Sequence, residues 1–400
     1  MKTTASAPWL FALCAMGFLT NGDIYSGAPL LISIATDLHV SISNAALSIT
    51  AYMIAFGLFN IVLGPLGDRF GRSRIIMVSS FGTALFSCAC ALVDTLPQLI
   101  ACRALNGAFA AGIMPMAVAI IGDACPESQR QKNISTLVGV MLLGGATATA
   151  LGGALAHWFS WKTVYLAYGL AELAISCLLA VTLENRPGTL ARLGFGGIYK
   201  AAFKNGRVLG CLFLVALSGF VVFGSFSYTG ELVRKATGMN LFAVGGILSF
   251  FGLGGVLSSR CAGVIKEIAL SRLCLWTGLG GALAMGLLSR VSSVPLICFL
   301  LLVWGFSFVS LHTSYVTVAQ NLIPGIRGSV MALMSLSMLS GGALGTMINR
   351  TLLTTVGINH LFLISSPLFA CIGLFTWIVL GYAHPNQETA GDDARGTAVP

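Results

Sequence analysis

Twelve apolar runs, each long enough to cross a membrane, dominate this 400-residue chain. A transmembrane helix needs about 20 apolar residues to cross roughly 30 Å of hydrocarbon. The runs cover residues 8–33, 44–66, 74–93, 97–122, 134–156, 161–183, 207–230, 238–258, 269–290, 294–318, 327–347 and 360–383. The sequence therefore predicts an all-α membrane protein with twelve transmembrane helices.

The composition excludes most other classes of protein. Hydrophobic residues make up 56% of the chain and charged residues 9%, against about 25% charged in an ordinary soluble protein. So little charge cannot cover a water-exposed globule of this size, and it also excludes a disordered chain and a nucleic-acid-binding domain. The 48 glycines fit membrane helices, which approach one another closely through small residues.

The sequence contains no pattern typical of an enzyme or a metal site. The closest cysteine pair, Cys88 and Cys90, has no matching second pair, so we expect no bound metal. The sequence has no nucleotide-binding loop and no nucleophile constellation, and it has only five histidines. We therefore expect no catalytic residue, no cofactor and no enzymatic activity.

The basic residues predict the orientation of the chain. If both termini are cytoplasmic, 16 of the 22 Lys and Arg residues lie on the cytoplasmic side and five lie in outer loops, while Arg103 lies inside a run. This asymmetry agrees with the positive-inside rule. We therefore expect a multi-pass protein with both termini in the cytoplasm.

The two halves of the chain look like copies of each other. The sequence Gly144–Gly145–Ala146 recurs 197 residues later as Gly341–Gly342–Ala343. Two such halves joined by a basic loop are the layout of transporters with parallel repeats. The expected parts are an N-terminal six-helix bundle over 1–183, a cytoplasmic linker over 184–206, a C-terminal six-helix bundle over 207–383 and a disordered cytoplasmic tail over 384–400.

The most specific motif follows the second apolar run, where Gly64–Arg74 reads G-P-L-G-D-R-F-G-R-S-R and is expected to form a short loop. Glycines permit a tight turn between helices, and a carboxylate can pair with helix N-termini or with an arginine. The segment resembles the signature loop of the major facilitator superfamily, which is thought to latch one conformation. The resemblance implies a conformational latch formed by Gly64, Gly67, Asp68, Arg69, Gly71 and Arg72.

Two further segments resemble motifs of the same family. Residues 103–112 read R-A-L-N-G-A-F-A-A-G, which is similar to the arginine-bearing motif of the fourth helix. The fifth run carries Gly144, Gly152 and Gly153 of an antiporter-type motif, although Ala148 and Thr149 stand where that motif has Gly-Pro. The missing proline weakens the inference of antiport, and close helix packing would also explain these glycines.

The resemblance covers essentially the whole chain and is closest to the twelve-helix drug/proton antiporter branch. It implies two pseudo-symmetric six-helix bundles, the major facilitator fold, which rock about a central site by alternating access. It also implies that a small amphipathic molecule is exported across the cell inner (plasma) membrane by proton entry. The expected partners are this substrate, protons and the lipid bilayer, with no nucleic acid, and the protein is expected to be a monomer.

Three charged residues within the runs are candidates for proton coupling, because charges inside a membrane are costly and mark function. They are Asp23, Arg103 and Glu172. At a rise of about 1.5 Å per residue, Asp23 and Arg103 both lie about 9 Å from the outer edge. We hypothesise that they pair and that protonation of Asp23 changes the pairing, although a permanent salt bridge also fits. Glu172 fits either a coupling role or a local structural pair.

Polar and aromatic side chains within the runs are candidates for a substrate cavity, because such mixtures bind small amphipathic molecules. The candidates are Thr20, Asn106, Met114, Ser225, Tyr228, Trp304, His312 and Tyr315. Each of them alone also fits helix packing, and His312 fits either a titrating group or a hydrogen bond between helices. Drugs, sugars, siderophores and other metabolites all remain possible substrates.

Two other functions remain open. An uptake symporter or facilitator of the same fold would share the buried acid and the signature loop. A non-transporting membrane sensor needs no proton cycle, so Asp23 and the Asp68 segment argue against it.

Overall fold

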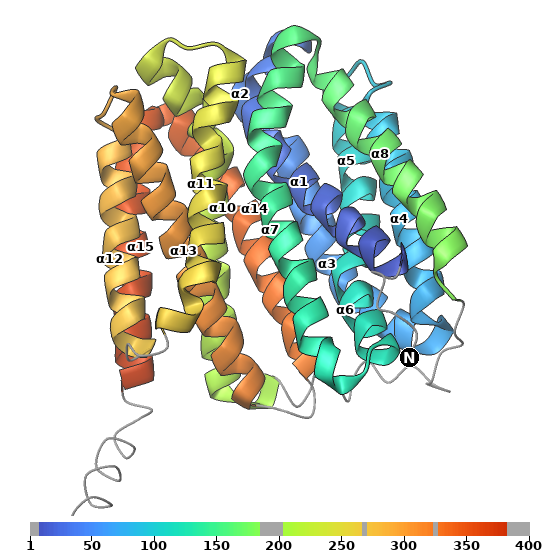
Figure 1. Cartoon of the computed structure of the whole chain (residues 1–400). Coiled ribbons are helices and arrows are strands. Elements are labelled where there is room, and N and C mark those ends of the chain that lie inside the picture. Colours follow the sequence, from blue (N-terminus) through green and yellow to red (C-terminus); the bar gives the residue numbers. More distant parts are fainter. Residues whose placement is uncertain (1–7, 185–202, 266–269, 323–326, 382–400) are drawn as a thin grey trace, which may run out of the picture.

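The computed structural model describes residues 8–184, 203–265, 270–322 and 327–381, and within them the chain is helical with no strand. Ten of these helices are long and apolar enough to cross a membrane, and α1 and α12 complete twelve crossings. The long helices run side by side through the molecule (Figure 1). The predicted all-α fold with twelve transmembrane helices is confirmed.

The helices fall into two sets of six crossings. The first set has the bounds α1 (Pro8–Asp37), α2 (Ile42–Ala45), α3 (Leu47–Phe70), α4 (Arg72–Cys90), α5 (Leu96–Ala110), α6 (Ile113–Ala124), α7 (Glu127–Trp158) and α8 (Trp161–Thr182). The second set has the bounds α10 (Gly206–Thr237), α11 (Leu241–Ile265), α12 (Leu270–Leu288), α13 (Val294–Leu322), α14 (Arg327–Thr355) and α15 (Ile358–Gly381). Most of the predicted linker over 184–206 and all of the predicted tail over 384–400 lie outside the described residues.

The fourth crossing consists of two helices, whereas one helix was predicted over 97–122. α5 ends at Ala110 and α6 begins at Ile113. Between them, the N–H of Gly112 donates to the Phe109 carbonyl three residues back, at 3.2 Å, instead of four residues back. Hydropathy predicts the crossing but does not reveal this turn, because an apolar run reads the same whether its hydrogen bonds are regular or not.

Equivalent glycines hold together the helices of each half. Gly144 of α7 lies against the backbone of Phe18 in α1. Its counterpart in the second half, Gly341 of α14, lies against the backbone of Ala216 in α10. The two glycines are 197 residues apart and their partners 198. The repeat read from the sequence therefore corresponds to a repeated packing contact.

A second glycine contact is repeated in the same way. Gly107 of α5 lies against the backbone of Tyr52 in α3, and a side chain on Gly107 would collide with the Tyr52 carbonyl. In the second half, Gly305 of α13 lies against the backbone of Phe251 in α11. Together with the first repeated contact, this supports the pseudo-symmetry of the two six-helix bundles.

The two bundles meet mainly along two pairs of helices, α7 with α11 and α3 with α14. In the α7–α11 seam, Gly153 lies against Gly245 with backbone facing backbone. Further along the same seam, Gly252 lies against Ala146. A Cβ atom on Gly252 or Gly153 would overlap main-chain atoms of the other half. The seam is therefore formed by bare helix backbones in close contact.

Among the described residues, three side-chain hydrogen bonds also join the halves. They lie toward the end of the bundle that contains α2, called here the α2 end, which is the upper end in Figure 1. The pairs are Thr149 with Ser249 at 3.1 Å, Thr50 with Thr346 at 2.6 Å and Arg350 with Asn44 at 2.5 Å.

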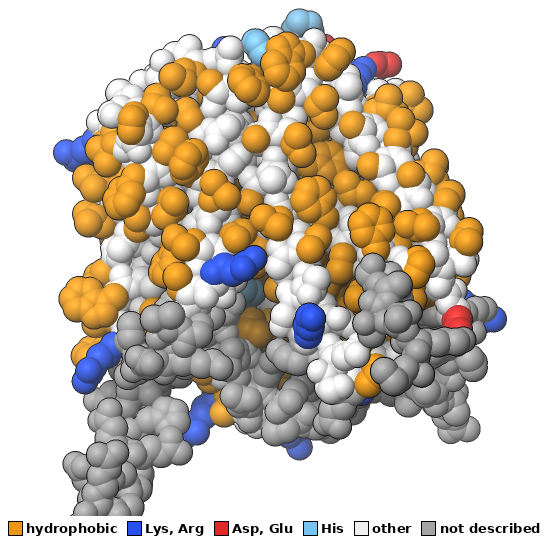
Figure 2. Space-filling model, in the orientation of Figure 1, with side chains coloured by type: hydrophobic (Ala, Val, Ile, Leu, Met, Phe, Trp, Pro, Cys, Tyr) orange, Lys and Arg blue, Asp and Glu red, His pale blue; other side chains and the backbone are white. Residues whose placement is uncertain are grey.

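The outer surface is suited to lipid. Hydrophobic side chains cover the middle of the face shown in Figure 2, and most Lys and Arg side chains lie nearer its two ends. Large apolar side chains such as Trp276, Phe213 and Leu283 are 64–69% exposed. Water would be a poor solvent for such a surface, whereas the hydrocarbon of a bilayer is a good one. The protein is therefore a multi-pass membrane protein.

The segment expected to form a loop after the second run is largely helical, which corrects the prediction. α3 continues through Phe70, α4 begins at Arg72, and only Gly71 separates them. Gly71 has φ 100° and ψ 126°, a conformation that residues with a side chain rarely adopt. Its N–H donates to the Gly67 carbonyl at 3.0 Å. The turn is this short because one glycine reverses the chain between two helices that extend past the apolar runs.

Replacing Gly71 with alanine is expected to destabilise the protein by about 1–3 kcal/mol, because alanine would be held in a sparsely populated backbone conformation. The matched control is Gly64→Ala, since Gly64 lies within α3 and a Cβ there meets no atom within 4 Å. Thermal unfolding in detergent should show a lower midpoint for Gly71→Ala and an unchanged or higher midpoint for Gly64→Ala. Equal midpoints for the two variants would contradict this account of the turn.

Candidate functional site

An ion pair lies buried within the first half. Arg103 of α5 donates from one terminal nitrogen, Nη1, to both carboxylate oxygens of Asp23 in α1, at 2.8 and 2.9 Å. Asp23 is 0% exposed and Arg103 is 1% exposed. The structure therefore brings together the two charges whose estimated depths matched in the sequence. Their part in proton coupling stays a prediction.

A polar chain extends from this pair toward α4. The Nη1 atom of Arg103 also donates to the side-chain oxygen of Asn106 at 3.0 Å. The Asn106 amide nitrogen then donates to both the carbonyl and the hydroxyl of Thr83, each at 3.0 Å. Asn106, predicted as a cavity residue, therefore links Arg103 to α4.

Two aromatic rings enclose the guanidinium of Arg103. Its central carbon lies 4.2 Å from the centre of the Tyr52 ring and 5.1 Å from the centre of the Tyr165 ring. The face of an aromatic ring attracts a cation, more strongly where water is excluded. The Arg103 Nε atom and both tyrosine hydroxyls are buried without a hydrogen-bond partner within the described residues. The rings therefore stabilise the cation with their faces and leave one donor of Arg103 unused.

Gly107 explains how Tyr52 reaches this position. Because Gly107 lacks a side chain, α5 packs directly against the backbone of Tyr52 in α3. Arg103 precedes Gly107 by one helical turn and therefore lies on the same face of α5. The close approach of α3 and α5 places the Tyr52 ring over the guanidinium. Sequence depth predicted the pair but not this ring, because depth does not report which helix neighbours α5.

Replacing Tyr52 with leucine is expected to destabilise the protein by about 2 kcal/mol or more, because a desolvated cation–π contact is lost and the core is repacked. Tyr52→Phe is the matched variant: it keeps the ring and removes a hydroxyl that has no partner within the described residues. Thermal midpoints in detergent should fall for leucine and stay near the wild-type value for phenylalanine. A phenylalanine variant as unstable as the leucine variant would show that the hydroxyl, and not the ring, matters.

Glu172 of α8 is buried near the same pair. It is 0% exposed, and neither carboxylate oxygen has a hydrogen-bond partner within the described residues. Asp23, Arg103 and the Thr83 side chain are its polar neighbours. The structure therefore places Glu172 inside the first bundle. Within the described residues, Glu172 forms no ion pair.

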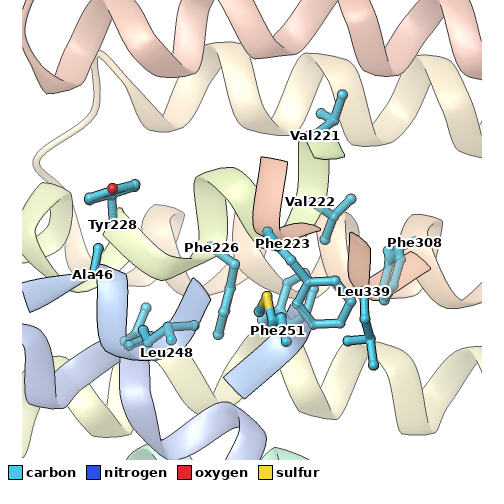
Figure 3. Packing of buried hydrophobic residues seen from close by; sticks show 14 of the residues in the cluster. Ala46, Val221, Val222, Phe223, Phe226, Tyr228, Leu248, Phe251, Phe308 and Leu339 are labelled. Atoms are coloured by element: carbon cyan, nitrogen blue, oxygen red, sulfur yellow. The ribbon is translucent and has the colours of Figure 1, made fainter. Parts of the chain in front are cut away.

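An aromatic cluster lies between the halves, within the core that Figure 3 shows in part. Phe251 of α11 is at its centre, with ring centroids 4.5 Å from Phe226 and 5.0 Å from Trp304. Tyr25 of the first half joins it, 5.9 Å from Phe226 and 6.4 Å from Phe251. Phe308 completes it, 6.1 Å from Phe251. Of these five residues, only Trp304 was among the predicted cavity residues.

Two nitrogen atoms in or beside this cluster have no hydrogen-bond partner within the described residues. They are Trp304 Nε1 and His312 Nδ1. The His312 ring stacks on Phe308 with centroids 6.0 Å apart. Unsatisfied buried polar groups are uncommon and call for an explanation. The Trp304 and His312 side chains are therefore the strongest of the predicted cavity candidates in the second half.

The other predicted cavity residues mostly form hydrogen bonds within or between helices. Ser225 donates to Ser365 at 3.1 Å, Tyr228 donates to the Thr346 carbonyl at 3.0 Å, and Tyr315 bonds Thr376 at 2.8 Å. Thr20 donates to the Met16 carbonyl one turn back at 2.9 Å, and Met114 packs in an apolar cluster. In this conformation these side chains serve helix packing.

The predicted latch includes a polar contact between α4 and α6. Arg72 Nη1 lies 2.5 Å from a carboxylate oxygen of Asp123 in α6, so the start of α4 is tied to the end of the fourth crossing. Sequence reasoning missed Asp123 because it lies in a different segment from the motif. Arg69 lies 5.0 Å over the Phe70 ring. The side chain of Asp68 lies outside the described part of the chain.

The glycines of the antiporter-like motif act in packing. Gly144 and Gly153 lie against the backbones of α1 and α11. Gly152 also faces α1, and a Cβ there would meet the Ser26 side chain at 3.5 Å, an ordinary contact. The three glycines therefore let α7 pack between α1 of its own half and α11 of the other.

Comparison with known proteins identifies related sequences and folds. The family model of the Major Facilitator Superfamily matches residues 12–346. The chain is 25% identical over 352 residues to the uncharacterized MFS-type transporter YceJ of Bacillus subtilis (strain 168), covering 85% of this chain and 87% of that protein. It is 24% identical over 297 residues to the multidrug transporter MdfA of Edwardsiella piscicida, covering 71% and 72%. The crystal structure of the nucleoside transporter NupG matches its fold with a TM-score of 0.73 at 14% identity, covering 93% and 99%.

Proposed function

This chain belongs to the major facilitator superfamily and is a transporter, and we propose that it exports a small amphipathic molecule across the inner membrane in exchange for protons. The observation that carries the proposal is the buried contact between Asp23 and Arg103. A relative named as a multidrug transporter supports the kind of substrate. Alternating access of the two bundles would expose the site to each side in turn.

Asp23 is the proposed proton-binding residue. Its carboxylate is buried in the first bundle, with both oxygens on Nη1 of Arg103. Binding of a proton would weaken this contact, and alternating access would let the proton leave on the other side. Glu172 is the proposed second protonatable group, because it is buried in the same bundle and its oxygens have no hydrogen-bond partner within the described residues.

The aromatic cluster is the proposed substrate-binding region. Its rings come from both halves, and the Trp304 and His312 nitrogens add polar atoms that have no partner within the described residues. Large apolar surfaces with a few polar groups bind amphipathic molecules. Tyr25 in this cluster is two residues from Asp23 in α1, so a substrate here would lie close to the proton site along the same helix.

The remaining expectations are proposals of the same kind. We propose cytoplasmic termini, because basic residues are then concentrated on the inner side. The turn at Gly71, together with the Arg72–Asp123 contact, is proposed to act as the conformational latch. The same proposal includes two further points. The protein transports its substrate as a monomer, and the linker over 184–206 divides the chain into its two bundles.

Inside-out membrane vesicles test the direction and the coupling together. When respiration acidifies the lumen, an antiporter should release protons as it carries an added amphipathic cation such as ethidium inward. The fluorescence of a lumenal pH indicator then reports proton release, and vesicles with Asp23→Asn are the matched control. Substrate-dependent proton entry into the lumen of right-side-out vesicles, without proton release from inside-out vesicles, would favour the uptake symporter. Identical responses from the wild-type and Asp23→Asn vesicles would contradict the proposed site.

A further inference from the structure

A polar cavity lies between the two halves at the α2 end of the bundle. Its volume is about 510 Å³, within the range of small-molecule sites. One wall is the turn into α2, which contributes Ser41, Ser43 and Asn44. The opposite wall is the last two turns of α14, which contribute Arg350, Thr351 and Thr354. The cavity is separate from the Asp23–Arg103 pair, since neither residue lines it.

Arg350 gives this cavity its chemistry. It is the charged side chain among the lining residues, and its hydrogen bond joins Nη2 to the side-chain oxygen of Asn44 at 2.5 Å. Within the part of the chain that the structure describes, no carboxylate lies within ion-pair distance of Arg350. A guanidinium bound to a neutral amide keeps its charge uncompensated. Its planar set of donors matches the oxygens of a carboxylate or phosphate.

The remaining lining residues favour an organic anion. Hydroxyl groups of Ser41 and Thr351 lie on opposite walls and can donate further hydrogen bonds. Met347, one turn before Arg350 in α14, lines the same cavity and is 47% exposed. An apolar side chain beside a cation offers a surface for the carbon chain of a ligand. Inorganic anions would use only the polar part of this site.

We propose that this cavity binds a small organic carboxylate, with the carboxylate on Arg350 and the carbon chain against Met347. Because the walls belong to different halves, the bound anion would bridge them and stabilise the arrangement of the two halves that the structure shows. The proposal does not depend on the identity of the transported substrate or on proton coupling.

The test uses the full-length protein purified in a neutral detergent, with sodium glutarate as the probe. Glutarate should raise the midpoint of thermal unfolding with the logarithm of its concentration above the dissociation constant, by about 3 °C at a concentration about 100 times that constant. Sodium chloride at matched ionic strength and glutaramide, which has the same carbon chain without charge, should give no such rise. A rise with glutaramide, or none with glutarate, would overturn the proposal.

Three variants test whether the effect belongs to the cavity. Arg350→Gln should lose the response to glutarate, while Arg290→Gln, a change to an exposed arginine outside the cavity, should keep it. Asn44→Asp covers the case in which Arg350→Gln folds poorly: the new carboxylate should pair with Arg350, raise the midpoint without ligand and abolish the response. A full response in Asn44→Asp would refute the assignment.

The same oxyanion chemistry could come from a lipid phosphate, and a further comparison separates the two sources. Short-chain phosphatidylglycerol is compared with phosphatidylcholine of the same chain length, each without added carboxylate. Stabilisation by glutarate with equal effects of the two lipids supports the proposal. An Arg350-dependent effect of phosphatidylglycerol with no effect of glutarate would show a lipid site instead and overturn the proposal.

Discussion

Replacing Asp23 with asparagine is expected to reduce proton-coupled transport to the level of vesicles that lack the protein. Asparagine keeps the size of the side chain and can still accept a hydrogen bond from Arg103, but it cannot bind and release a proton. The variant should insert and fold with reduced stability, because the Tyr52 and Tyr165 rings still face the Arg103 cation that has lost its carboxylate. Proton release on substrate addition in inside-out vesicles gives the activity, and the amount of folded protein from detergent gel filtration gives the control for expression.

The matched control for this change is Asp94→Asn. Asp94 pairs with Lys162 at 2.7 Å, but its side chain is 85% exposed. An exposed pair of this kind contributes about 0–1 kcal/mol, so Asp94→Asn should transport normally. Normal proton-coupled transport by Asp23→Asn would show that the buried pair is a permanent structural salt bridge. Loss of transport in both variants would point to a general effect of removing charge.

Replacing Arg103 with alanine is expected to destabilise the protein by about 3–5 kcal/mol, because Asp23 would be left as an uncompensated buried charge. Adding Asp23→Asn to Arg103→Ala should recover much of this loss, since the second change removes the stranded charge. The double variant should still fail to transport. Unfolding in mixed detergent micelles measures the stability of the two single variants and the double variant, and the double-mutant cycle gives the coupling energy.

Lys162→Ala is the matched control for the stability effect. It removes the cation of the exposed Asp94–Lys162 pair, so it should cost less than about 1 kcal/mol. If the double variant of Asp23 and Arg103 is no more stable than Arg103→Ala alone, the cost lies in lost packing against Tyr52 and Tyr165 and not in the stranded charge. If the double variant recovers stability but does not transport, the contribution of the Asp23–Arg103 pair to stability is distinct from its proposed role in proton coupling.

The crossings were predictable from the sequence because a bilayer requires apolar segments of a fixed length. The ends of the helices were less predictable. α3 runs on to Phe70, beyond the apolar run that ends near residue 66, because a helix can continue into the polar interface once its hydrogen bonds are satisfied internally. Gly71 was within the recognised motif, but only its positive φ shows that the turn is a single residue long.

The sequence predicted how deep the residues of the candidate site lie in the membrane. It did not predict toward which neighbouring helix each side chain points. Counting residues along two helices of opposite direction gave Asp23 and Arg103 the same depth, and they are in contact. The same count cannot show that Tyr52 and Tyr165 enclose the arginine, because ring contacts depend on which helices are neighbours. Glu172 was expected near the midplane, yet its burial without a partner within the described residues required the structure.

The aromatic cluster shows a signal that sequence reasoning could have used. Phe226 of the cluster lies three residues after Phe223 in α10. In α13, Trp304 and Phe308 of the cluster are four residues apart, and His312 follows four residues later. Such spacings place side chains on one helix face. An apolar membrane sequence contains many faces of this kind, so only the packing of α10 against α13 distinguishes this one from a face that meets lipid.

The seam between α7 and α11 bears on how the halves could move past each other. Where Gly153 meets Gly245 and Gly252 meets Ala146, no large side chain of one helix has to leave a space in the other helix before the two surfaces shift. Across such a contact, the two helices could rotate against each other while their backbones stay close together. The resistance to turning would then come from the hydrogen bonds across the halves, such as Arg350 with Asn44. The residues that allow the helices to rotate would then differ from the residues that hold the halves in place. A substitution could therefore change one property without changing the other.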